Sequence, residues 1–321
     1  HSNQVHVIGI GRSGTSWLLK IFDHHPETLS LHEPELVLRK SMRRLAASTQ
    51  TTGIPHDSVS QPQLERARRA LLFSKRPLRA VRRRPIVRKQ TRSGLAHVAR
   101  NFLIYGLSAL ERTTPEAISR ALRAAPIPDL GRPPAHVIVK SVGLLNEVEA
   151  YVAANPDLHI VFMIRHPCAN AVSIRTGQDH GLMSDTYLPP RPFIDRYFRF
   201  EKPATELTEA DFTPEEIIAL RWAVYNQLME DMAEQYDHVT LIVYDELCDQ
   251  PIRVARELFA RVGVPWHADV ESFLSSSLAH EGSGDKYHAV IRNPVAARDR
   301  WRETLSTDQR DEMMRTARQA S

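Results

Sequence analysis

The chain has 321 residues, 42% of them hydrophobic and 25% charged, which is an ordinary composition for a globular protein. No apolar run approaches the roughly 20 residues that a membrane-spanning helix needs, and the two cysteines are too few for a disulfide framework and indicate free thiols in a reducing compartment. Because a strand-like segment begins at Val5, we expect no signal peptide and a cytoplasmic location.

Positive charge is concentrated in one region of the chain. The net charge is only +4, yet residues 36–100 hold seventeen Lys and Arg against two acidic residues, a local net charge of +15. The rest of the chain is therefore net negative. This asymmetry indicates an anionic partner for one region only.

Short apolar runs alternate with helical patterns along the chain. The runs predict buried strands at 5–10, 136–140, 159–164 and 239–244, and a short extended piece at 30–34. The patterns predict helices at 15–24, about 146–154, 170–176, 214–236 and 251–262, a loop-rich stretch at 177–212, and loop and helix at 270–321. Residues 36–125 lack strong strand patterns and look helical. We therefore predict a large, basic helical insert at about 36–135. We therefore expect one α/β domain over 1–321, with three layers and a central parallel sheet.

The loop after the first strand matches a nucleotide-binding loop in its spacing. Gly9-Ile-Gly-Arg-Ser-Gly14-Thr15-Ser16 fits G-x-x-x-x-G-K-[ST], except that Thr15 stands where the lysine should be. Successive N–H groups and the following helix N-terminus can still bind an anion, and Arg12 supplies a cation. The loop thus predicts a site for a phosphate-like group without the ammonium of a kinase. The alternative is a glycine-rich turn with no ligand.

The segment R-S-G-T-S-W resembles the 5′-phosphosulfate loop of the sulfotransferases that use 3′-phosphoadenosine 5′-phosphosulfate (PAPS). This resemblance implies a P-loop-like fold and contacts to the 5′ end of PAPS. The residues that it implies are Arg12, Ser13, Gly14, Thr15 and Ser16. Trp17 stands where cytosolic members place a tryptophan that stacks on adenine, with a helix-core role as the alternative.

The segment I-R-H-P-C-A-N-A-V-S resembles the 3′-phosphate site of the same family. The resemblance implies that Arg165 and Ser173 bind the 3′-phosphate. Arg165 follows a predicted strand, where ligands bind in open α/β sheets, and a guanidinium suits a phosphate dianion. The family usually has Asp or Asn where this chain has His166, so no role is transferred to that residue.

Two further segments resemble this family. In R-W-A-V-Y-N through V-Y-D-E-L-C-D-Q-P we expect structural roles for Trp222 and Tyr244, and Asp245 is expected to tie the strand end to nearby backbone. S-G-D-K-Y-H-A-V-I-R-N-P-V resembles a C-terminal segment of the protein-tyrosine and related Golgi-type members. In them a lysine before P-V reaches the cofactor, and Arg292 is the nearest counterpart here.

The resemblance implies in-line transfer of a sulfuryl group from PAPS to a hydroxyl, or less readily an amine, leaving 3′,5′-adenosine bisphosphate (PAP) and needing no metal. The histidine base of cytosolic members is absent from Lys140-Ser141-Val142. Other members use a glutamate about twenty residues after the loop, following His-Pro, and Glu33 stands at that distance. We therefore expect Glu33 to be the general base. His32 is the alternative base, and Lys140 and Arg12 are candidates for stabilising charge on the leaving group.

The role of the basic insert stays open among three interpretations. Residues 64–89 mix arginine clusters with apolar residues, which suits an acidic glycan acceptor, peripheral contact with an anionic membrane, or a solvated helical lid. No motif that reads DNA or RNA accompanies the charge, so no nucleic acid is expected. The acceptor, a small molecule, glycan or lipid, and the oligomeric state are not fixed by the sequence.

Two other functions compete with sulfuryl transfer. An atypical P-loop kinase or NTPase would explain the loop, although Thr15 argues against it. A non-enzymatic module that binds membrane or nucleic acid would explain the basic insert, but it leaves Arg165 and Ser173 without a purpose.

Overall fold

The structure is a computed structural model. It describes residues 3–36, 38, 60–74, 76–81, 94–128, 133–181, 183, 187–200, 206–279 and 293–319. The chain divides into two compact units. Unit 1 comprises 1–8, 16–161 and 255–274, and unit 2 comprises 9–15, 162–254 and 275–321.

A five-stranded sheet has the order β2-β3-β1-β4-β5. Its strands are β1 (Gln4–Ile8), β2 (Thr28–His32), β3 (His136–Ser141), β4 (His159–Ile164) and β5 (Val239–Val243). In unit 1, β3 pairs in parallel with both β1 and β2. Two of the four neighbouring pairs, β3-β1 and β1-β4, are not consecutive in sequence, so crossover connections join them. This confirms the predicted α/β class with a central parallel sheet.

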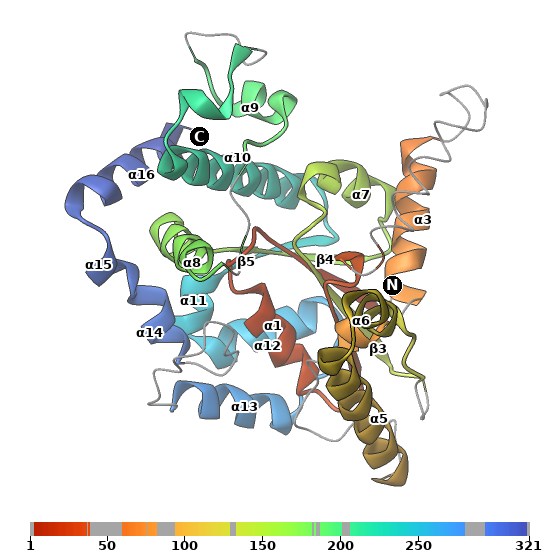
Figure 1. Cartoon of the computed structure of the whole chain (residues 1–321). Helices are drawn as coiled ribbons and strands as arrows, with labels where there is room; N and C mark the ends of the chain where they lie inside the picture. Colours follow the sequence, from red (N-terminus) through yellow and green to blue (C-terminus); the bar gives the residue numbers. More distant parts are fainter. Residues whose placement is uncertain are drawn as a thin grey trace. The chain divides into compact units, whose positions relative to one another are not determined.

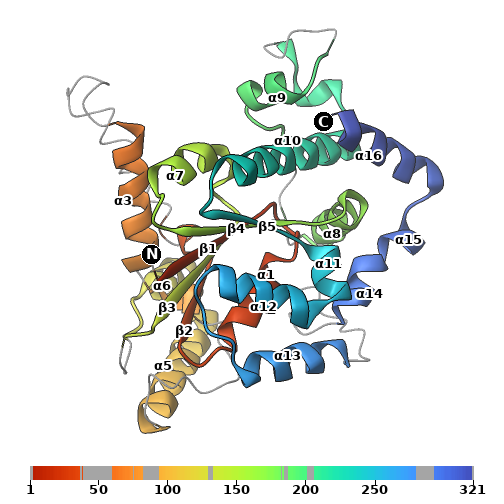
Figure 2. The ribbon, with the colours of Figure 1, turned by 180° about the vertical axis from the view of Figure 1, so that it is seen from behind.

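Unit 1 has helices on both faces of its strands (Figures 1 and 2). On one face, His6 of β1 packs against Phe73 of α3 (Gln61–Ser74) and Tyr151 of α7 (Val148–Ala154). On the other lie α1 (Thr15–Asp23) and α12 (Pro251–Arg261), whose Phe22 and Phe259 rings stack 4.6 Å apart. Successive strand side chains point to opposite faces, so the nearly continuous burial of β1 requires these two layers.

Between β2 and β3 the described residues are mostly helical, as predicted for residues 36 to about 125. They form α3, α4 (Leu78–Val81), α5 (Gly94–Thr113) and α6 (Glu116–Ala124). A 3-10 turn, η1 (Leu145–Glu147), then leads into α7 after β3. Another helix, α13 (Ala268–Leu278), lies near the end of α1. There the ring of His24 stacks on the ring of Phe273, with ring centres 3.8 Å apart.

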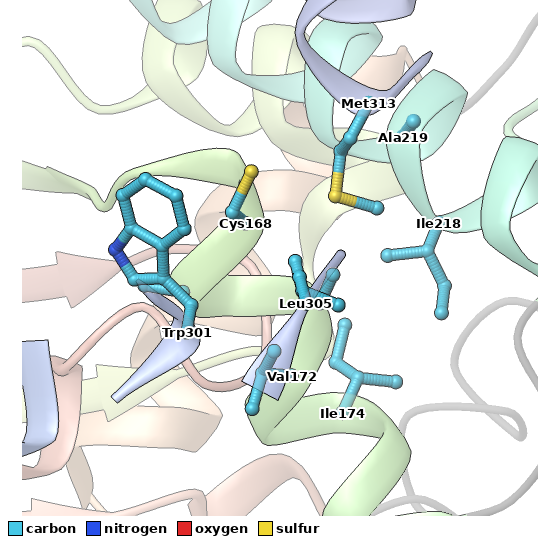
Figure 3. Packing of buried hydrophobic residues seen from close by; sticks show 10 residues of the cluster. Cys168, Val172, Ile174, Ile218, Ala219, Trp301, Leu305 and Met313 are labelled. Carbon is cyan, nitrogen blue, oxygen red and sulfur yellow. The ribbon is translucent and has the colours of Figure 1, made fainter. Parts of the chain in front are cut away.

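Unit 2 is built on α8 (Pro167–Asp179), α10 (Pro214–Gln235) and the C-terminal helices α14 (Pro294–Asp299), α15 (Trp301–Thr304) and α16 (Thr307–Gln319). Figure 3 shows the core that joins them, where Cys168 and Val172 of α8 meet Ile218 of α10 and Leu305. The start of α10 follows from its sequence. Thr213 and Glu216 form a reciprocal capping box, which satisfies two backbone N–H groups.

Several predicted boundaries differ from the structure: β1 ends at Ile8, β2 spans Thr28–His32 and α8 spans Pro167–Asp179. The loop-rich stretch at 177–212 contains α9 (Arg191–Tyr197) and a 3-10 turn, η3 (Glu209–Asp211). The prolines that suggested a loop fit α9 because Pro192 lies in its first turn, where no intrahelical N–H bond is lost. The last strand ends at Val243, and Tyr244 begins α11 (Tyr244–Asp249). In the part of the chain that the structure describes, no helix is long and apolar enough to cross a bilayer.

Candidate active site

The loop after β1 has the backbone of an anion-binding turn. Arg12 and Gly14 have φ angles of 74° and 95°, with Ser13 between them, whose N–H donates to the carbonyl of Ile10 at 3.1 Å. Backbone that alternates between left- and right-handed conformations turns successive N–H groups toward one side, which creates a concave site for negative charge. The helix α1 begins directly after it, at Thr15.

Close approach of other groups also requires glycine in this loop. A Cβ on Gly14 would lie 2.2 Å from Cδ2 of Tyr244, and its φ is unfavourable for any other residue. A Cβ on Gly9 would lie 2.9 Å from the carbonyl oxygen of Met163. Tyr244, which was predicted to be structural, therefore packs directly against the loop.

The structure brings together three residues that the two motifs single out. Nε of Arg12 donates to Oγ of Ser173 at 2.9 Å, although 161 residues separate them. Arg165 donates from Nη1 to the carbonyl of Arg12 at 3.0 Å. Asn170 donates from Nδ2 to the carbonyl of Gly11, also at 3.0 Å. These bonds lie within unit 2 and fix the loop against α8.

Arg165 is enclosed on several sides. Its guanidinium lies 4.8 Å from the centre of the Tyr244 ring, and Nη2 donates to the carbonyl of Ala297 at 2.5 Å. Nε is buried and has no hydrogen-bond partner among the described residues. The backbone around it is held by Trp222, whose Nε1 donates to the Arg165 carbonyl at 2.8 Å, and by Asp245, which accepts the N–H of His166 at 3.2 Å. The structural role expected for Asp245 is therefore confirmed.

In unit 1, Glu33 and Lys140 meet at the carboxyl ends of β2 and β3. Lys140 Nζ donates to Oε1 of Glu33, and the Glu33 N–H donates to the Lys140 carbonyl at 2.8 Å. The pairing follows from the parallel register, which sets His32 opposite Lys140. Lys140 is 3% exposed, whereas the side chain of Glu33 is 17% exposed. Glu33 also has a φ of 48°, an unusual value for a residue with a side chain.

His32 links Glu33 to the residue that follows the loop. Its Nδ1 lies 3.8 Å from Oε2 of Glu33, and its Nε2 lies 3.3 Å from Oγ of Ser16. The tautomer decides which of Ser16 and His32 donates. This chain of polar contacts therefore runs from Ser16, in the first turn of α1, through His32 to Glu33.

The remaining loop residues are largely enclosed. Ser13 and Thr15 are 1% and 2% exposed. Trp17 is also buried and lies in the core-facing part of α1. Arg292 falls outside the described residues. Among the residues that the structure describes, no group of three or more His, Cys, Asp or Glu is arranged to hold a metal ion.

Sequence reasoning missed two buried polar residues. Oε1 of Glu35 accepts the N–H groups of Val142 and Gly143 at 3.2 and 3.3 Å, and burial raises the pKa of its carboxyl. Its only sequence signal is its position two residues after Glu33. Asn170 lies one helical turn before Ser173, and that spacing could have indicated that both face the loop.

A family model described as "Sulfotransferase family" matches residues 4–268. The chain belongs to the sulfotransferase family. The matched range includes every candidate site residue except Arg292. The sequence left three functions open: sulfuryl transfer, a P-loop kinase or NTPase, and a non-enzymatic module. Membership of the sulfotransferase family favours sulfuryl transfer.

Solved sulfotransferase structures resemble the chain over most of its length. The sulfotransferase domain of the Synechococcus PCC 7002 olefin synthase is 15% identical, with 98% of this chain and 92% of that chain covered and a TM-score of 0.44. Mouse SULT7A1 in complex with PAP is 12% identical, with 98% and 84% covered and a TM-score of 0.44. STF9 from Mycobacterium avium is 11% identical, with 98% and 75% covered and a TM-score of 0.42. No curated protein sequence matches the chain significantly.

Proposed function

We propose that this sulfotransferase moves a sulfuryl group from PAPS to a hydroxyl of its acceptor, with Glu33 as the general base. The observation that carries the proposal is the contact of Arg12 with Ser173 and Arg165, which joins the residues of both cofactor motifs. The guanidinium groups of Arg12 on the concave loop and of Arg165 after β4 suit a ligand that carries two separate phosphate groups.

The residues of this site fit PAPS. The loop N–H groups from Arg12 to Ser16 would bind its 5′-phosphosulfate end, and Arg165 and Ser173 would bind its 3′-phosphate. Arg165 has an unpartnered, buried Nε–H, and a charged donor of this kind is costly to bury without an acceptor. Each terminal nitrogen of its guanidinium also has a second hydrogen beyond the bond it donates to a carbonyl.

When bound, PAPS supplies the sulfuryl group, whose transfer breaks the bond between sulfur and the oxygen of the 5′-phosphate. Glu33 accepts the proton of the acceptor hydroxyl as the new oxygen–sulfur bond forms. Protonated Glu33 no longer neutralises the Lys140 ammonium, so that cation becomes available to stabilise negative charge on the leaving group. Arg12 adds a second positive charge at the loop.

His32 positions the base in this mechanism. It lies against Glu33 on one side and Ser16 on the other, so it restricts the rotation of both side chains. His32 as the base itself is the alternative assignment. The acceptor class that we propose is a hydroxyl on a small molecule, a glycan or a lipid.

The test is thermal unfolding of the full chain with PAP or with ATP and magnesium. A ligand that binds only the folded state raises the melting temperature. We expect PAP to raise it for the wild type and for Arg175→Ala, a matched control because Arg175 lies on α8 but is 42% exposed and paired with Glu215. Arg165→Ala should lose the shift. Ser173→Ala should reduce it and covers the case in which Arg165→Ala does not fold. No shift with PAP, or a larger one with ATP and magnesium, would contradict the proposal.

A further inference from the structure

The outer face of α5 is apolar and exposed to solvent. Leu95 is 82% exposed, Val98 63%, Phe102 79% and Tyr105 64%. Their spacing of three or four residues places them along one side of the helix. These four residues, which we call the α5 stripe, are therefore a continuous apolar surface on a helix of an otherwise polar region.

No charged side chain interrupts this side of the helix. From Leu95 to Leu110, the exposed residues outside the stripe are Ala99, Gly106, Ala109 and Leu110 itself. The charged side chains Arg100 and Glu111 lie on the buried side instead. A helix on the surface of a globular protein normally has the reverse arrangement, with apolar residues inside and charged residues outside. The α5 stripe is therefore built for a partner that is apolar.

Within unit 1, α5 contacts α4 and α6, and its buried residues are Arg100, Ile104 and Glu111, of which Glu111 accepts a hydrogen bond from Arg123 of α6. Figure 1 shows α5 alongside α6, with the N-terminal part of α5 extending away from it. Ile118 of α6 is also 52% exposed and adds an apolar residue beside the helix. The stripe thus lies on the side of α5 that these two neighbours leave free.

Positive charge surrounds the α5 stripe in sequence. Residues 82–92, just before α5, contain six Arg and Lys and no acidic residue. At the other end of α5, Arg112 is exposed, whereas Arg120 of α6 is paired with Glu116. An apolar helix face that directly follows a cationic segment in the sequence is complementary to a surface whose interior is apolar and whose edge is anionic.

We propose that the α5 stripe binds the surface of an anionic membrane. The helix lies in the plane of the headgroups, with Leu95, Val98, Phe102 and Tyr105 among the upper acyl chains. Its 20 residues are not apolar enough to cross the bilayer. A second copy of this chain fits the charges less well, because each copy carries six Arg and Lys and no acidic residue in the segment just before α5. This inference is independent of the proposed acceptor.

The test is flotation of the full chain with lipid vesicles. We expect the wild type to float with vesicles of phosphatidylcholine and phosphatidylserine at a 7:3 ratio, and to float much less with phosphatidylcholine alone or at high salt. The double substitution Leu95→Ser with Phe102→Ser should lower the bound fraction about tenfold, since it removes two large apolar side chains from the interface. Each single substitution should give part of that loss.

Tyr187→Ser is the matched control, because Tyr187 is an exposed aromatic residue of unit 2, 47% exposed and outside the stripe. It should float like the wild type. Unchanged melting temperatures would show that the variants fold, as is expected for exposed positions. Equal flotation of the double variant, or none of the wild type, would overturn the proposal. A wild-type dimer that the double variant converts to a monomer, without vesicle binding, would assign the stripe to a second copy instead.

Discussion

Among the described residues, Arg12 and Glu33 are the non-glycine residues with positive φ. Such backbone costs about 1–2 kcal/mol for a residue with a Cβ, and it persists where the surroundings enforce it. For Glu33 the enforcing contacts are its N–H bond to the Lys140 carbonyl and its ion pair with the Lys140 ammonium. The sequence motifs predict that both residues act in the site. Their backbone conformation distinguishes the same two residues independently.

Glu33→Gln should slow sulfuryl transfer while leaving PAP binding intact. The amide keeps the size of the carboxylate and can still contact Lys140, but it cannot accept the acceptor's proton. We expect kcat to fall by about 100- to 10,000-fold, the usual contribution of general acid–base catalysis. The measurement is steady-state transfer from PAPS to a hydroxyl acceptor, beside PAP binding.

His32→Asn tests the positioning role of the neighbouring histidine. If Glu33 is the base, this variant should lose less activity than Glu33→Gln, as measured by steady-state transfer from PAPS to a hydroxyl acceptor. A larger loss in His32→Asn than in Glu33→Gln would make His32 the base and reverse the two assignments.

Gly14→Ala should destabilise the protein by more than about 2 kcal/mol, because a Cβ would meet the Tyr244 ring in a left-handed backbone. Gly106→Ala is the matched control. Its Cβ would meet nothing within 4 Å and would lie in the exposed part of α5, where alanine favours the helix by about 0.5–1 kcal/mol. Chemical denaturation of both variants measures the contrast, and similar stabilities would show that Tyr244 moves aside readily.

At the scale of elements, β1 carries a buried histidine that makes folding sensitive to acid. His6 is fully buried beside Tyr151, with Nδ1 2.8 Å from the hydroxyl, and burial lowers its pKa from 6.5 to about 3. The unfolded chain therefore binds a proton that the folded chain excludes. The contribution of His6 to stability is fully present above about pH 6.5 and is lost as pH falls from there toward 3.

His6→Asn should flatten this dependence, since asparagine can still contact the Tyr151 hydroxyl and does not titrate. Free energies of unfolding at pH 7.5, 6.0 and 5.0 would measure it. Between pH 7.5 and 5.0 the wild type should lose more stability than the variant. Parallel losses in the two proteins would show that His6 stays neutral in the unfolded state or becomes protonated in the fold.

The sequence predicted the strands and the helices that cover them because continuous apolar runs and helical periodicity are local properties. It did not predict α9, because the prolines at 190 and 192 also suit a loop. The contact between Arg12 and Ser173, 161 residues apart, was not predicted, because the resemblance assigns the two residues to different groups of the cofactor and no local pattern encodes the contact. Glu35 was missed because burial of a carboxylate depends on the backbone of Val142 and Gly143, far along the chain.

At the scale of the whole molecule, the two units are interleaved along the sequence. The chain passes from one to the other five times, at both ends of segment 9–15, within β4, within α12 and within α13, so a single cut releases neither unit intact. We therefore expect one cooperative unfolding transition, whose midpoint PAP raises as a whole. Differential scanning calorimetry with the calorimetric and van't Hoff enthalpies compared would measure it. Two transitions, with only one sensitive to PAP, would contradict this prediction.

At Arg12, which has a left-handed backbone, the residue that suits the fold best differs from the residue that suits the reaction best. Glycine adopts this conformation without strain, and every arginine codon is a single base change from a glycine codon. Arg12→Gly should therefore arise readily and keep or raise the melting temperature, while sulfuryl transfer falls sharply. A population selected only for heat tolerance would drift toward glycine here. If arginine persists under laboratory evolution, sulfuryl transfer itself must be under selection.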